Sequence, residues 1–189
     1  MIRFGLPGIL RSDKDFLAAH VGNYILGGGS FSSRLMAEIR EKRGLTYDIS
    51  TGLDVYRRAG VFVGQVATRA DAVNQTIAVL RQTLADFAAN GPTEKELVDA
   101  KTYLTGSYPL AFQSNAGIAG QLNSFQRVGL PIDYVTRRNQ LINAVTIEDV
   151  KRVASRLYNP SRLTIIVAGT PAQTKAGTKP RPPAVAPRK

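Results

Sequence analysis

Two hydrophobic periods alternate along this chain, and their order predicts an α+β fold. Apolar positions recur at helical spacing between residues 12 and 43, with Leu17 and Val21 in one predicted helix and Leu35 and Ile39 in a second. From residue 47 to 67 the period falls to two, which predicts two antiparallel strands joined by a turn. Helical spacing returns from 71 to 157, and residues 163–168 form a last predicted strand. This order predicts a mainly antiparallel sheet with helices packed on one face.

The expected helix ends depend on capping patterns. Ser12–Asp15 and Thr93–Glu96 both have the form of a capping box, and Asp71 and Thr146 occupy N-cap positions. Gly44 suits the left-handed residue that follows a helix end. These signals divide the helical regions into separate, short helices.

A glycine triplet, Gly27–Gly29, ends the first predicted helix. Free backbone N–H groups there could cradle an anion. No strand precedes the triplet and no Lys followed by Ser or Thr comes after it, so both phosphate-binding fingerprints fail. A tight connection between two helices is the favoured interpretation.

Length and composition indicate one domain, residues 1–170, followed by a Pro- and Lys-rich tail, residues 171–189, that is predicted to be disordered. The 189 residues are 43% hydrophobic, which is enough for a substantial core. The chain starts almost at once with strand sequence, which suggests a piece of a longer protein. Neither a secretion signal nor a membrane span is visible.

Composition also excludes several kinds of active site. The chain has no Cys and a single His, His20, so thiolate zinc sites, Cys nucleophiles and His-rich metal clusters are ruled out. A structural role is favoured for His20. The net charge is +11, but the basic pairs at 57–58, 137–138 and 151–152 are scattered and lack an RNA-binding aromatic signature. Solvated faces are therefore favoured over a nucleic-acid surface.

One segment carries a sharper hypothesis. A helix ends near Arg40, Gly44 reverses the chain, and Tyr47 follows seven positions after Arg40 on a strand whose alternation places Tyr47 and Ile49 on one face. The turn can bring the guanidinium and the phenol to one edge of the sheet, where both could donate to a carbonyl oxygen. Spacing alone still favours a structural alternative, with Arg40 complementing the helix dipole and Tyr47 packed.

An ordered series of motifs resembles the C-terminal half of the pitrilysin/insulinase family of inverted zinc peptidases, which includes mitochondrial processing peptidase. The resemblance covers residues 2–170. The matching stretches are Phe4–Gly8, Asn23–Gly29, Phe31–Leu35, Arg40–Tyr47, Gly91–Leu97 and Leu163–Gly169.

The resemblance implies a half-domain that closes with a second, similar half around a peptide. In such peptidases one half carries the H-x-x-E-H motif that binds zinc, and the other contributes an Arg and a Tyr to substrate binding and transition-state stabilisation. Arg40 and Tyr47 occupy the matching positions. No H-x-x-E-H is present here, so zinc is expected in the missing half and this chain alone is expected to be inactive. Bacterial relatives are found inside the cell and in the envelope, so the resemblance leaves both a cytoplasmic and a periplasmic location open.

Three functions remain open at this point. The leading one is the substrate-binding half of a zinc peptidase, whose partner is a zinc-bearing half in the same full-length chain or in a separate subunit. The second is a noncatalytic scaffold or assembly subunit of the same fold. The third, ranked low, is a basic nucleic-acid-binding domain.

Overall fold

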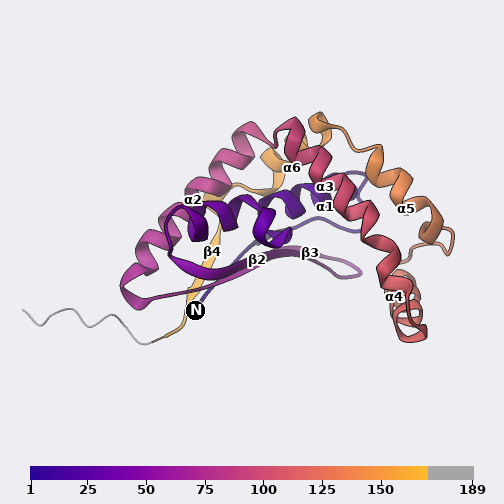
Figure 1. The fold of residues 1–189 in the computed structure, drawn as a ribbon, viewed down its shortest axis with the longest axis horizontal. Helices are drawn as coiled ribbons and strands as arrows, with labels where there is room; N and C mark the ends of the chain where they lie inside the picture. The colour runs from indigo at the N-terminus through magenta and orange to yellow at the C-terminus, as the bar shows by residue number, and fades with distance from the viewer. Residues whose placement is uncertain (170–189) are drawn as a thin grey trace, which may run out of the picture.

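The computed structural model describes residues 1–169, in which helices cover one face of a four-stranded sheet (Figure 1). The strands are β1 (Ile2–Pro7), β2 (Thr46–Val55), β3 (Gly60–Thr68) and β4 (Thr164–Val167). The α-helices are α1 (Phe16–Asn23), α2 (Val73–Asn90), α3 (Glu94–Gly106), α4 (Asn115–Arg127), α5 (Tyr134–Asn143) and α6 (Ile147–Leu157). The tail predicted at 171–189 lies outside the described residues.

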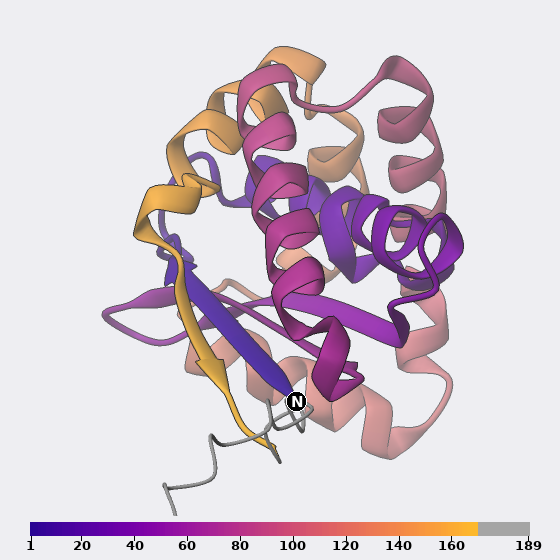
Figure 2. The same ribbon diagram turned by 90° about the vertical axis from the view of Figure 1, so that its left-hand side faces the viewer.

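The sheet has the strand order β2-β3-β1-β4, and every neighbouring pair is antiparallel. The predicted α+β class, with a mainly antiparallel sheet and helices on one face, is confirmed. β1 lies inside the sheet, where Ile2 is the partner of Val66 on β3 and of Val167 on β4. Figure 2 shows the helices stacked on one side of the strands, while α4 alone descends past the end of the sheet.

The core lies between the sheet and the helices. Alternate strand residues such as Phe4, Ile49 and Phe62 face inward and join one buried cluster with Leu80 and Phe87 of α2. This burial of apolar surface is the main favourable term in folding. The opposite face of the sheet carries no helix along most of its length (Figure 1).

Tyr158, just after α6, is fully buried in this core with its ring centroid 5.1 Å from that of Phe62. Its hydroxyl has no hydrogen-bond partner within residues 1–169, and burial raises the pKa of the phenol. We expect Tyr158→Phe to increase the free energy of unfolding by about 1 kcal/mol, because a buried, unsatisfied hydroxyl is removed. Urea unfolding measures the change, and Tyr103→Phe at an exposed position is the control. A destabilised Tyr158→Phe would show that the hydroxyl has a stabilising contact.

The capping predictions were correct in two places and wrong in two. Thr93 and Thr146 both cap helices through capping boxes, and that of Thr93 includes Glu96 as predicted. Asp71 caps nothing and pairs with an exposed Arg in the preceding turn. At the start of α1, Asp15 is the N-cap residue but its side chain makes no capping bond.

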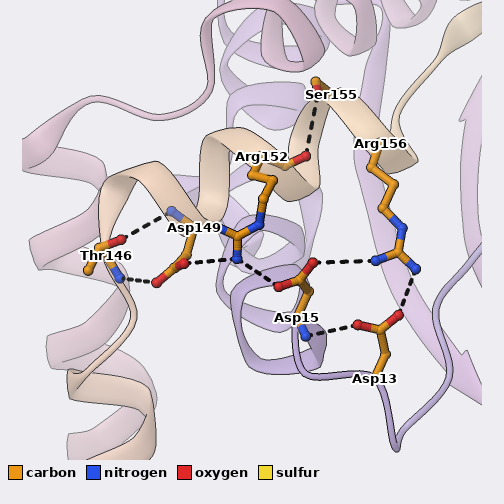
Figure 3. Close-up of polar contacts among 7 residues, drawn as sticks. All are labelled: Asp13, Asp15, Thr146, Asp149, Arg152, Ser155 and Arg156. Atoms are coloured by element: carbon orange, nitrogen blue, oxygen red, sulfur yellow. Dashed lines mark hydrogen bonds and ion pairs between the residues drawn. The ribbon is translucent and has the colours of Figure 1, made fainter.

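The carboxylates of Asp13 and Asp15 instead tie the start of α1 to α6 (Figure 3). Asp15 accepts from Arg152 at 2.7 Å and from Arg156 at 3.4 Å, while Asp13 accepts from Arg156 at 2.6 Å. The hydrogen bond from Arg156 holds the pKa of Asp13 below its ordinary value. The predicted capping box at Ser12–Asp15 was therefore wrong, because the Asp15 N–H donates to the Asp13 carboxylate at 2.9 Å and the Asp15 carboxylate binds two distant arginines.

None of the helices described in residues 1–169 is both long enough and apolar enough to cross a membrane.

Candidate functional site

The candidate site lies where a short helical segment, Met36–Glu41, turns into the edge strand β2. Met36 and Ile39 are buried in the core, which leaves Arg40 at the border of the solvent-facing side. The N–H of Gly44 donates to the Arg40 carbonyl at 2.8 Å, with Gly44 in the left-handed region at φ +58°. A non-glycine residue would be strained there. The predicted left-handed glycine at this helix end is confirmed.

A β-bulge at the start of β2 turns Tyr47 outward. The pairing with β3 shifts by one residue between Thr46 and Ile49, and the Thr46 hydroxyl oxygen lies within hydrogen-bond distance of the Asp48 and Ala67 carbonyl oxygens in this stretch, at 2.7 and 2.6 Å. Tyr47 is 81% exposed, whereas Ile49 is fully buried. The prediction that the two share a face was wrong, because a bulge breaks the alternation that defines the faces.

The Arg40 guanidinium lies between two aromatic rings. Its carbon is 4.7 Å from the ring centroid of Phe31 and 5.3 Å from that of Tyr47. Both rings are largely exposed, and Phe31 comes from the short 3-10 turn Ser30–Ser32. Such cation–π contacts orient an arginine without neutralising its charge. The structure therefore brings Arg40 and Tyr47 together, as predicted. It also places Phe31 at this site, a residue that the sequence analysis had named only as part of a family motif.

The cations next to Arg40 are already paired. Lys42 and Arg43 both donate hydrogen bonds to the Glu38 carboxylate. These bonds hold the pKa of Glu38 below its ordinary value, and the bond from Lys42 has the larger effect. Arg40 takes part in none of the ion pairs formed within residues 1–169. Its positive charge is thus held in place but left free for a ligand oxygen.

The segment that carries Phe31 and Arg40 is fixed by close packing. A Cβ on Gly27 would lie 2.6 Å from the Thr51 hydroxyl oxygen, so glycine allows the helical turn to approach β2. Arg34 makes two bonds to Glu96 of α3, at 2.5 and 2.6 Å. The glycine triplet connects two helical turns, as the favoured interpretation predicted.

The uncovered face of the sheet is hollowed, although Phe31, Arg40 and Tyr47 do not line the hollow. A concavity of about 730 Å³ is lined by solvent-facing residues of all four strands, among them Arg3, Ser50, Val63 and Ile166. These positions alternate with the buried ones, as expected for a sheet with one solvated face.

The donor set of the described residues does not fit zinc. His20 lies with its Nε2 3.5 Å from an Arg138 nitrogen, and no group of three His, Cys, Asp or Glu side chains occurs within residues 1–169. Burial first, and then the charges of Arg138 and Arg11, lower the pKa of His20 to about 4. A neutral imidazole beside two guanidiniums is a poor place for a divalent cation.

Known proteins resemble the chain in both sequence and structure. Residues 1–104 match the family model described as "Peptidase M16 inactive domain". The "Non-peptidase homolog YmxG" of Helicobacter pylori is 31% identical over 80% of this chain and 34% of that protein. An uncharacterized zinc protease of Streptomyces coelicolor is 31% identical over 79% of this chain and 32% of its own length. The chain therefore spans about a third of the curated relatives it matches.

A solved structure shows the same fold. The peptidase M16 inactive domain from Pseudomonas fluorescens superposes with a TM-score of 0.80 at 38% identity, and covers 90% of this chain and 41% of that one. The similarity thus extends over nearly all of the described residues.

Proposed function

This chain belongs to the peptidase M16 family and contains its inactive domain, and from this premise we propose that it is the substrate-binding, non-zinc half of a zinc metalloendopeptidase. The partner in this proposal is a half that carries H-x-x-E-H, on the same full-length protein or on a separate subunit. The peptide to be cleaved lies between the two halves.

One observation carries the proposal. The Arg40 guanidinium is held between the exposed rings of Phe31 and Tyr47 and has no acidic partner within residues 1–169. The neighbouring Lys42 and Arg43 are both paired with Glu38, so neither of these cations is available to a ligand in the way that Arg40 is. An oriented, unpaired cation at a solvent-facing edge fits a ligand that brings its own oxygen.

Arg40 and Tyr47 would act on the substrate backbone next to the scissile bond. A guanidinium and a phenol are both hydrogen-bond donors, and amide hydrolysis places negative charge on the carbonyl oxygen in the transition state. Donors fixed in advance stabilise that charge because they need little reorganisation. The bulge supports this role, since it turns the Tyr47 side chain out of the core.

Reconstitution tests the proposal. The 189-residue chain is mixed or coexpressed with the H-x-x-E-H half of its full-length protein or partner subunit, and hydrolysis of a fluorogenic peptide library is followed. We expect cleavage only when both halves are present, and none from this chain alone. A zinc-bearing half that cleaves equally fast without this chain would overturn the proposed role.

The second candidate is a noncatalytic subunit that uses the same fold only to pair with another half. The name "Non-peptidase homolog" of the Helicobacter pylori relative favours keeping this candidate. A full-length protein without H-x-x-E-H would favour it, and so would a stable complex between the halves that cleaves no peptide. Complex formation without hydrolysis in the same reconstitution would select it.

A further inference from the structure

A second cavity lies at the far end of β2 from Tyr47. Its volume is about 710 Å³, and its walls come from the tip of the β2–β3 hairpin, the start of α1, the end of α4 and the start of α5. Figure 1 shows α4 and α5 next to one another at this end of the molecule. From Tyr47 to Asp54 the strand advances by about 23 Å, so the two sites are separate.

Aromatic and aliphatic side chains make up much of the wall, and three arginines line it: the exposed Arg127, and Arg11 and Arg138, which are partly buried. Arg11 lies 4.3 Å from the ring centroid of Phe16 and 4.9 Å from that of Tyr134. Arg138 lies 4.3 Å from the ring centroid of Tyr108. The rings hold both guanidiniums at defined positions.

Neither of the two partly buried arginines meets a carboxylate within residues 1–169. Arg138 donates to the Leu104 carbonyl at 2.9 Å and to the Asn139 side chain at 3.2 Å. Neither Arg11 nor Arg138 takes part in any ion pair formed within residues 1–169. Asp54 lies on the rim and is exposed, without an ion pair to either arginine. In contrast, the neighbouring Arg137 on the solvent side of α5 is paired with Asp133.

The exposed Arg137 has an acidic partner and the partly buried Arg11 and Arg138 have none within residues 1–169, which is the reverse of what solvation alone would favour. Exposed arginines need no acidic partner, because water solvates their charge, whereas a partly buried cation without a counter-charge costs free energy. Burial lowers the pKa of both Arg11 and Arg138, and each also lies near His20. Cation–π contacts offset part of the cost but leave the positive charge uncompensated.

We propose that this cavity binds a carboxylate attached to an apolar body, with Arg11 and Arg138 holding the carboxylate and the aromatic wall holding the body. The cavity volume falls within the usual range for small-molecule sites, and an apolar lining with a few convergent polar groups is their usual composition. Two sources supply this chemistry: a free hydrophobic acid, and the C-terminus of a peptide that ends in an apolar residue. The proposal does not depend on the peptidase role of Arg40 and Tyr47.

Calorimetry on the 189-residue chain tests this with matched pairs of probes. The first pair is 4-phenylbutyrate and 4-phenylbutyramide, and the second is N-acetyl-Ala-Ala-Phe with a free or an amidated C-terminus. We expect the acid of at least one pair to bind at least about tenfold more tightly than its amide, since charge-assisted bonds to arginine are lost in the amide. Binding of the small acid alone identifies a free acid as the source, and binding of the peptide alone identifies a C-terminus.

Substitutions locate the binding. Arg11→Gln and Arg138→Gln should each lower the affinity for the acid probe by about tenfold or more. Arg137→Gln is the control, because it removes one positive charge from the adjacent exposed position and should leave this affinity unchanged. When the acid probe is added to the unsubstituted chain, the amide signals that shift in NMR spectra should cluster at residues 11–20 and 134–138. This measurement does not depend on whether the variants fold. Equal binding of acids and amides, no binding of any acid, or shifts elsewhere would each overturn the proposal.

Discussion

We expect Arg40→Ala to lower kcat/KM of the reconstituted peptidase by about a hundredfold or more, because one positioned oxyanion donor is worth about 3 kcal/mol in the transition state. The side chain lies between Phe31 and Tyr47 at the surface and carries no ion pair within residues 1–169, so its removal should leave the fold intact. Steady-state hydrolysis of a fluorogenic peptide measures the effect, and thermal unfolding checks that the domain remains folded.

Lys42→Ala is the matched control, since it also removes one positive charge from the same helix end. Its ammonium is bonded to Glu38, and exposed ion pairs are worth at most about 1 kcal/mol, so kcat/KM should fall by less than about fivefold. Tyr47→Phe keeps the ring beside Arg40 and removes only the hydroxyl, so a lower rate in this variant assigns the donor role to the phenol. Parent rates in both Arg40→Ala and Tyr47→Phe would show that the assigned roles are wrong.

We expect Phe62→Ala to reduce the free energy of unfolding by about 3–5 kcal/mol, the usual cost of removing a fully buried aromatic ring. Phe62 is fully buried on β3, with its ring centroid 6.2 Å from that of Phe4 and 5.1 Å from that of Tyr158. Removing the ring leaves a cavity between the sheet and the helices that both neighbours border. Urea denaturation followed by circular dichroism gives the change.

Ile132→Ala provides the comparison for this loss of apolar volume. Ile132 is 80% exposed, so its truncation should change stability by no more than about 0.5 kcal/mol. A Phe62→Ala variant that loses less than about 1 kcal/mol would contradict the assignment of the core to the helix-covered face of the sheet.

The architecture could be predicted from the sequence because its signals are local. Helical and strand periods, and the capping boxes at Thr93 and Thr146, depend on residues a few positions apart. The box predicted at Ser12–Asp15 failed for the opposite reason. Asp15 bonds Arg152, 137 positions away, and a partner that distant leaves no mark in the local pattern.

The candidate site was predictable in part for the same reason. Arg40 and Tyr47 are joined by a short turn with a left-handed glycine, so their proximity follows from spacing. The exposure of Tyr47 does not, because the bulge depends on how β2 pairs with β3. Arg11, in the segment before α1, and Arg138 of α5 line the same cavity because α1 packs against α5, and the sequence did not reveal this packing.

The interior position of β1 has a consequence for synthesis on the ribosome. β1 is made first, yet its two neighbours, β3 and β4, end at Thr68 and Val167. Until the last of these emerges, one side of β1 is an open edge that can pair with other chains. The nascent domain can therefore complete its sheet only after β4 has left the ribosome, which makes the interval before β4 docks the period of greatest aggregation risk for this domain.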